Sequence, residues 1–155
     1  MNVLFSVHPD YLDRIFDREK TVELRNRPVR VQPNTWMWLY ATSPRKSLEG
    51  RAVVLRVIID TPTKVWRRFK TELGITRGDF FSYVGSRSLI SAIQLTRIER
   101  FATPLRLGRI RAAVADFHPP QFYVRLSMQN RLYHVLKTHA ECNQPTCSDN
   151  SQSAF

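Results

Sequence analysis

The run from Thr35 to Ala41 (Thr-Trp-Met-Trp-Leu-Tyr-Ala) strongly constrains how this chain can fold. Aromatic residues favour β-strands, and successive side chains of a strand point to opposite faces. Alternation places three large aromatic side chains on one face and a methionine and a leucine on the other: Trp36, Trp38 and Tyr40 against Met37 and Leu39. Because both faces are apolar, we predict a strand that is central in its sheet or lines a pocket.

Other strand and helix patterns lie on both sides of this run. Apolar runs bounded by turn residues predict strands, and helical spacing after a proline or a cap predicts helices. The expected strands are 2–7, 19–25, 51–60, 88–101 and a short one near 122–124. Two of the expected helices begin at Pro9 and Pro62, and three more cover 77–84, 107–114 and 127–138. This irregular order predicts an α+β domain, a mixed barrel or curled sheet with helices outside.

The segment 19–25 (Glu-Lys-Thr-Val-Glu-Leu-Arg) is the candidate functional strand. Alternation sends its valine and leucine to a core and leaves Glu23 and Arg25 on the opposite face. Lys20 stands at the start of the strand, where its side chain can reach either face. Three charges between apolar positions are costly to hold near a core, which favours a site. The alternative is an edge strand with a solvated, salt-bridged face, because most such clusters are structural.

The charge of the chain favours a polyanionic partner. The net charge is +11, from 24 Lys and Arg against 13 Asp and Glu, and 19 of the 24 are Arg. Arginine forms bidentate contacts with phosphate and stacks on bases, so a strongly basic, Arg-rich domain points first to nucleic acid. The alternative is that the charge serves only solubility.

The remaining signals concern location and metal binding. No apolar run is long enough to span a membrane, and the N-terminus lacks a signal-peptide pattern, so we expect a cytoplasmic protein with no membrane partner. We expect a domain over residues 1–138 and a disordered polar tail over 139–155. The tail holds Cys142 and Cys147, which match no strong zinc motif, so we expect no metal and no other cofactor.

The charged strand resembles the signature of the ASCH domain, a branch of the PUA-like superfamily. That signature reads Gly, any residue, Lys, two residues, Glu, any residue, Arg. Lys20, Glu23 and Arg25 match it, and Arg18 stands where Gly is usual. Later segments are also similar to ASCH proteins, and the resemblance covers about residues 1–125: these segments are 39–44, 83–85 and 119–121.

The resemblance implies a small β-barrel of about five to six strands with flanking helices and a cleft beside the signature strand. Such domains are thought to bind RNA or modified nucleotides, and some members are linked to RNA cleavage. One bacterial branch hydrolyses the acetyl amide of acetylcytidine with a Lys, a Thr and a Glu. Lys20 matches that Lys, whereas the Thr falls where this chain has Glu23, and no residue here is matched to the Glu.

Two functions follow as hypotheses. In the first, the cleft binds RNA, another single-stranded nucleic acid or a modified nucleoside. The expected ligand-binding residues are Lys20, Glu23, Arg25, Arg27, Tyr40, Ser43, Arg45 and Lys46. In the second, the same cleft belongs to a hydrolase, either a ribonuclease or an acetylcytidine amidohydrolase, with Lys20 as base and Glu23 as proton shuttle. A protein-interaction or regulatory role is a third reading that the sequence neither supports nor excludes.

Overall fold

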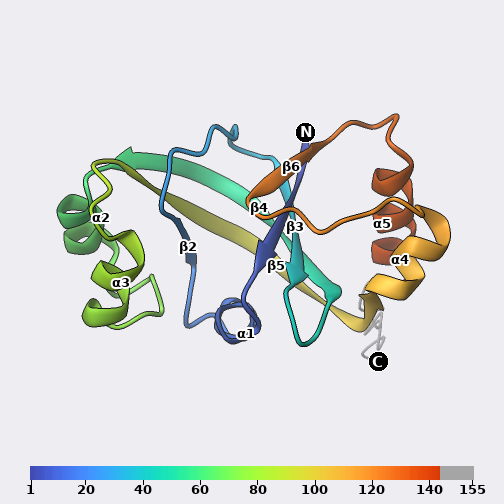
Figure 1. Cartoon of the computed structure of the whole chain (residues 1–155), viewed down its shortest axis with the longest axis horizontal. Coiled ribbons are helices and arrows are strands. Elements are labelled where there is room, and N and C mark those ends of the chain that lie inside the picture. The colour runs from blue at the N-terminus through green and yellow to red at the C-terminus, as the bar shows by residue number, and fades with distance from the viewer. Residues whose placement is uncertain (144–155) are drawn as a thin grey trace, which may run out of the picture.

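The computed structural model describes residues 1–143 of the 155-residue chain and has an α+β fold built on one curled, half-barrel sheet (Figure 1). The strands follow the order β2-β5-β4-β3-β1-β6, so β2 and β6 form the two edges. This confirms the expected α+β class. The elements are β1 (Asn2–Val7), α1 (Pro9–Phe16), β2 (Val22–Arg25), β3 (Trp36–Ala41), β4 (Ser47–Asp60), α2 (Pro62–Phe69), α3 (Arg77–Val84), β5 (Ile90–Arg106), α4 (Leu107–Ala113), β6 (Tyr123–Leu126) and α5 (Arg131–Cys142).

Strand β3 is central, as its two apolar faces predicted. It pairs in parallel with β1 and antiparallel with β4. Trp38 and Tyr40 pack in one buried cluster, which α4 and α5 complete, whereas Met37 and Leu39 pack with Phe5 in another. The strand is therefore covered on both faces, and its aromatic side chains help to build the core.

Apart from α1, the helices lie at opposite ends of the sheet. Helices α2 and α3 lie at one end, and α4 and α5 at the other (Figure 1). Val22 and Leu24 of β2 pack in a third buried cluster with Phe69 of α2 and Phe80 of α3. This packing fixes the edge strand β2 and turns its other face toward the open side of the half-barrel.

Strands β4 and β5 are longer than the sequence predicted. Strand β4 already begins at Ser47, and β5 continues to Arg106. Shifts of register in the ladder between them accommodate the turn-like residues before Arg51. Gly50 sits at such a shift, where an added Cβ would meet the carbonyl oxygen of Glu99 and lie 2.6 Å from the ring of Phe16. The turn signal at 48–50 therefore marks a close approach of backbone within a continuous strand.

Helix α5 is displaced from its expected range. It begins after Asn130, whose side chain accepts a hydrogen bond from the backbone N–H of Leu132, and it continues to Cys142. The sequence predicts that residues 139–142 belong to the tail, but they are helical because Leu136 and Ala140 continue the buried stripe of α5. Cys147 and the other tail residues from 144 lie outside the described residues. None of the helices within residues 1–143 is long and apolar enough to cross a membrane.

Candidate functional site

Lys20 enters the site just before β2 and is only 2% exposed. Its Nζ donates a hydrogen bond to the carbonyl oxygen of Leu73 (2.7 Å) and lies 3.8 Å from Oε2 of Glu23. The backbone N–H groups of residues 21 and 22 both donate to the carbonyl oxygen of Glu72. The connection between α2 and α3 therefore holds the start of β2 and the amine of Lys20 together.

Gly74 allows this close contact. Its φ is +59°, and a Cβ on it would lie 2.7 Å from Cβ of Lys20. The carbonyl oxygen of Gly74 accepts a hydrogen bond from Nη1 of Arg14 (2.5 Å), which ties the same connection to α1. A side chain at position 74 would strain the backbone and displace Lys20.

Arg25 reaches from β2 across the open side of the half-barrel. Its Nη2 lies 3.0 Å from Oε1 of Glu23 and donates to the carbonyl oxygen of Ser6 on β1 (2.8 Å). Its guanidinium carbon lies 4.9 Å from the centre of the Phe5 ring. Glu23 and Arg25 therefore share a face, as alternation predicted. Although β2 is an edge strand, the alternative of a solvated, salt-bridged face is excluded, because Glu23 is only 5% and Arg25 8% exposed.

Lys20, Glu23 and Arg25 form what we call the buried triad, with two cations and one carboxylate. Burial lowers the pKa of Lys20 below its usual value, and the positive charges of Arg25 and Arg14 lower it further, while Glu23 opposes the shift. An ammonium group taken from water is destabilised unless its partners replace the lost hydration. The triad is therefore an electropositive group in which Lys20 loses its proton more readily than an exposed lysine does.

A cleft opens beside the triad, and we call this part the triad lobe. It encloses about 590 Å³ of empty space, including its open mouth. Tyr11 and Tyr83 give it two aromatic side chains, and burial raises the pKa of Tyr83. The residues that line it are Ser6, Val7, His8, Tyr11, Lys20, Glu23, Leu24, Arg25, Ile75 and Tyr83.

A second hollow, the tyrosine lobe, adjoins the first and encloses about 870 Å³, including its mouth. Ser6 lines both lobes, so the two are neighbours. Tyr40 is 1% exposed, and its hydroxyl has no hydrogen-bond partner in the described part of the chain. Burial raises the pKa of this phenol. The lining residues are Ser6, Tyr40, Thr42, Ser43, Lys46, Leu107, Arg111, Pro119, Pro120 and Gln121.

The structure separates the expected site residues into groups. The buried triad lines the first lobe, and Tyr40, Ser43 and Lys46 line the second. Ser6, Tyr83 and Arg111 line the cleft but were not expected to. The local sequence around Ser6 and Arg111 carries no signal for a site, since distant strands and helices bring them to the cleft, whereas Tyr83 belongs to the segment 83–85, which supported the family resemblance. Gln121 belongs to a segment that supported the family resemblance.

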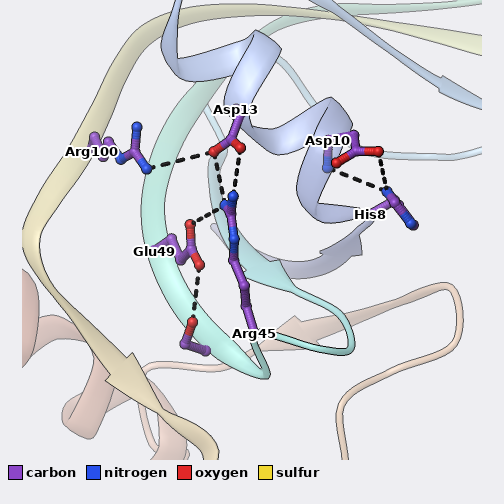
Figure 2. Close-up of polar contacts among 7 residues, drawn as sticks. His8, Asp10, Asp13, Arg45, Glu49 and Arg100 are labelled. Carbon is purple, nitrogen blue, oxygen red and sulfur yellow. Dashed lines mark hydrogen bonds and ion pairs between the residues drawn. The ribbon is translucent and has the colours of Figure 1, made fainter.

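Arg27 and Arg45 line neither lobe. Arg27 is exposed and its guanidinium carbon lies 4.9 Å from the centre of the Phe122 ring. Arg45 donates from Nη2 to Asp13 (2.5 Å) and from Nη1 to Glu49 (3.2 Å), as Figure 2 shows. The hydrogen bond from Arg45 holds the pKa of Asp13 below its usual value. Arg45 therefore joins α1 to β4, and the sequence missed this role because Asp13 lies in a distant element.

Two further ring side chains are engaged by neighbouring residues. His8 caps α1 by accepting from the backbone N–H of Asp10, and its ring lies near the carboxylate of the same residue (Figure 2). The ring of Trp36 is covered by Arg51, whose guanidinium carbon lies 4.1 Å from the ring centre. Among residues 1–143, no group of three or more His, Cys, Asp or Glu side chains is arranged to hold a metal ion.

Comparison with known proteins places this arrangement in a family. Residues 1–117 match the family model described as "Domain of unknown function (DUF365)". The chain belongs to this family. The DUF365 chain is also an ASCH domain, which confirms the resemblance seen in the signature strand. It is similar to an ASCH domain-containing ribonuclease of Zymomonas mobilis, with 27% identity over 118 residues, or 76% of this chain and 79% of the relative.

Solved structures show that the DUF365 chain has a PUA-like fold. The crystal structure of ASCH from Zymomonas mobilis has a TM-score of 0.80 and 24% identity, with 88% of this chain and 94% of that chain covered. Human THYN1, solved in complex with 5-methylcytosine-containing DNA, has a TM-score of 0.54 and 10% identity, with 89% and 96% covered. At these identities the likeness concerns the fold alone.

Proposed function

We propose that this DUF365 protein binds single-stranded RNA in the two-lobed cleft. The observation that carries the proposal is a buried triad with an excess positive charge beside a lobe with two exposed cations, Lys46 and Arg111. Such an arrangement attracts a polyanion and also offers hollows for unstacked bases. The relative named as a ribonuclease and the neighbour solved with DNA support the same class of ligand.

The two lobes suit different parts of a nucleotide. In the triad lobe, Glu23 accepts hydrogen bonds from the exocyclic amine of a base, and Tyr11 and Tyr83 supply aromatic surface for stacking. In the tyrosine lobe, Lys46 and Arg111 neutralise a phosphate group. Arg27, on the loop after β2, adds a more distant phosphate contact. A modified nucleotide whose base retains such an amine is recognised by the same groups.

We expect the protein to prefer single-stranded RNA over duplex RNA, single-stranded DNA and duplex DNA. The measurement is fluorescence anisotropy with four labelled probes of matched sequence across a salt series. Affinity falls as salt rises, and the logarithm of the binding constant drops by about 0.7 per tenfold increase in salt for each phosphate contact on a single strand. The preference for RNA is expected to persist at high salt, because hydrogen bonds to base and sugar are screened less than surface charges are. Equal binding of all four probes, lost together as salt rises, would contradict the proposal.

RNA cleavage in the same cleft is the second candidate function. Two observations favour it: the lowered pKa of Lys20 and the similarity to a relative named as a ribonuclease. A neutral Lys20 amine would take the proton of a ribose 2′-hydroxyl, and the oxygen would attack the adjacent phosphorus. The 5′-oxygen would leave with that proton, which Glu23 relays from the Lys20 ammonium, giving a 2′,3′-cyclic phosphate and a 5′-hydroxyl.

The same anisotropy samples distinguish binding from cleavage. Each RNA is recovered and run on a denaturing gel, and a matched RNA with one 2′-deoxy position is run beside it. Cut RNA with protection at the deoxy position supports cleavage, whereas bound but intact RNA leaves the protein a binding module. Acetylcytidine, tested in parallel for release of acetate, covers the amide chemistry that the same amine and carboxylate would serve.

A further inference from the structure

Two residues that are neighbours in the sheet carry buried hydroxyl groups without partners in the described part of the chain. Ser6 and Tyr40 are paired in the parallel ladder of β1 and β3, so their side chains project from the same face of the sheet. Neither Oγ of Ser6 nor the hydroxyl of Tyr40 has a hydrogen-bond partner in the described residues. Both residues line the tyrosine lobe. Unpaired buried hydroxyls are uncommon and costly, so these two groups point to a ligand that completes them.

Ser6 also marks the boundary between the lobes. Its carbonyl oxygen accepts the hydrogen bond from Nη2 of Arg25, the same atom that pairs with Glu23 in the triad lobe. A nucleotide that places its base beside Glu23 and its phosphate beside Lys46 must cross this boundary with its ribose. The sugar therefore passes Ser6, whichever base it carries.

We propose that the hydroxyl of Ser6 binds the ribose 2′-hydroxyl and thereby selects RNA over DNA. This inference rests on the proposed function and adds the residue that sets its sugar specificity. A serine hydroxyl donates one hydrogen bond and accepts others, and the 2′-hydroxyl does the same, so the two groups satisfy each other. A deoxyribose in the same place leaves Oγ of Ser6 unpaired, as it is in the free protein.

The test compares Ser6→Ala with wild type on a single-stranded RNA and on DNA of the same sequence with deoxyuridine for uridine. We expect the preference of wild type for RNA over DNA to fall by about three- to tenfold in the variant, the contribution of one net hydrogen bond. Affinity for DNA is expected to stay within about twofold, since no hydroxyl contact is lost there. Ser127→Ala, a change at an exposed serine, is the matched control.

A second measurement begins with wild type, where the fold of the variant does not matter. Single 2′-deoxy substitutions are walked along the RNA, and the binding of each to wild type is measured. We expect one position, or two adjacent ones, to lose affinity with wild type, and the same substitutions to have no effect with Ser6→Ala. Circular dichroism melts verify that the variant is folded, and a gel verifies that the RNA is intact.

The outcomes separate this inference from the proposed function. An unchanged RNA-to-DNA ratio in Ser6→Ala, or a uniform response along the 2′-deoxy walk, overturns the role of Ser6 while RNA binding stands. Failure of wild type to bind any RNA overturns the proposed function itself. Loss of affinity for RNA and DNA alike in Ser6→Ala also overturns the role, because the residue then acts on the shape of the cleft.

Discussion

Replacing Glu23 with glutamine is expected to lower the free energy of unfolding by about 3–5 kcal/mol. Within residues 1–143, Glu23 is the carboxylate that ion-pairs with both Lys20 and Arg25. All three side chains are buried, so the amide would leave two cations without a counter-charge and without water. Breaking a buried ion pair by removing one partner costs far more than removing a surface pair. Urea denaturation and thermal melts monitored by circular dichroism measure the change.

Glu141→Gln is the matched control for this experiment. Glu141 is exposed on α5 and lies 3.8 Å from Lys137, so its loss is expected to cost less than about 0.5 kcal/mol. If Glu23→Gln lowers the free energy of unfolding as little as the control does, the triad is hydrated. The claim that the cleft holds buried charges would then be wrong.

Replacing Lys20 with methionine is expected to separate stability from function. Methionine keeps the unbranched apolar stem, and the pair of Glu23 and Arg25 remains. Burial disfavours the charged amine, but methionine leaves the carbonyl oxygen of Leu73 without its donor, so we expect the free energy of unfolding to fall by about 1–3 kcal/mol, less than in Glu23→Gln. RNA affinity is expected to fall by about tenfold or more, because the triad loses one of its two cations beside the cleft. Denaturation curves and anisotropy on the same preparations measure both effects.

The pH dependence of stability gives an independent check on Lys20. Its pKa is lowered in the folded chain from the usual 10.5, so between these two values the unfolded chain binds more protons. Stability therefore rises with pH across that window in wild type, and this rise is expected to be absent from Lys20→Met. Below the lowered pKa both states carry the proton, and Lys20 adds no further slope. A parallel response in the two proteins would show that the pKa of Lys20 is not lowered.

Lys137→Met supplies the control for binding. It removes one positive charge from an exposed position on α5. Equal losses of RNA affinity in Lys20→Met and Lys137→Met would show that Lys20 acts only through the net charge. A larger loss at fixed salt in Lys20→Met would assign the effect to the cleft.

Patterns confined to one strand were predictable from the sequence. Alternation alone placed Val22 and Leu24 in a core and Glu23 with Arg25 on the opposite face, and the structure confirms both. The two apolar faces of β3 likewise gave its central place in the sheet. In each case the side-chain period of a strand decides the outcome, and no distant residue is needed.

Contacts between distant elements were not predictable in the same way. Arg45 follows a turn and has the pattern of a phosphate contact, yet Asp13 on α1 occupies its guanidinium. Ser6 has no unusual neighbours in sequence and enters the site only because β1 pairs with β3 and Arg25 reaches across to it. Arg111 depends on the packing of α4 at the far end of the sheet. These side chains acquire their positions from sheet topology.

Photo-crosslinking tests most directly whether RNA occupies the cleft. An RNA that carries 4-thiouridine is bound, irradiated and digested, and the attached residues are identified by mass spectrometry. We expect crosslinks at residues of the triad lobe, foremost Tyr11 and Tyr83, and their loss in Lys20→Met. Crosslinks confined to the exposed basic surface of α2, at Lys64, Arg67 and Arg68, would contradict the account, because RNA would then bind by surface charge alone.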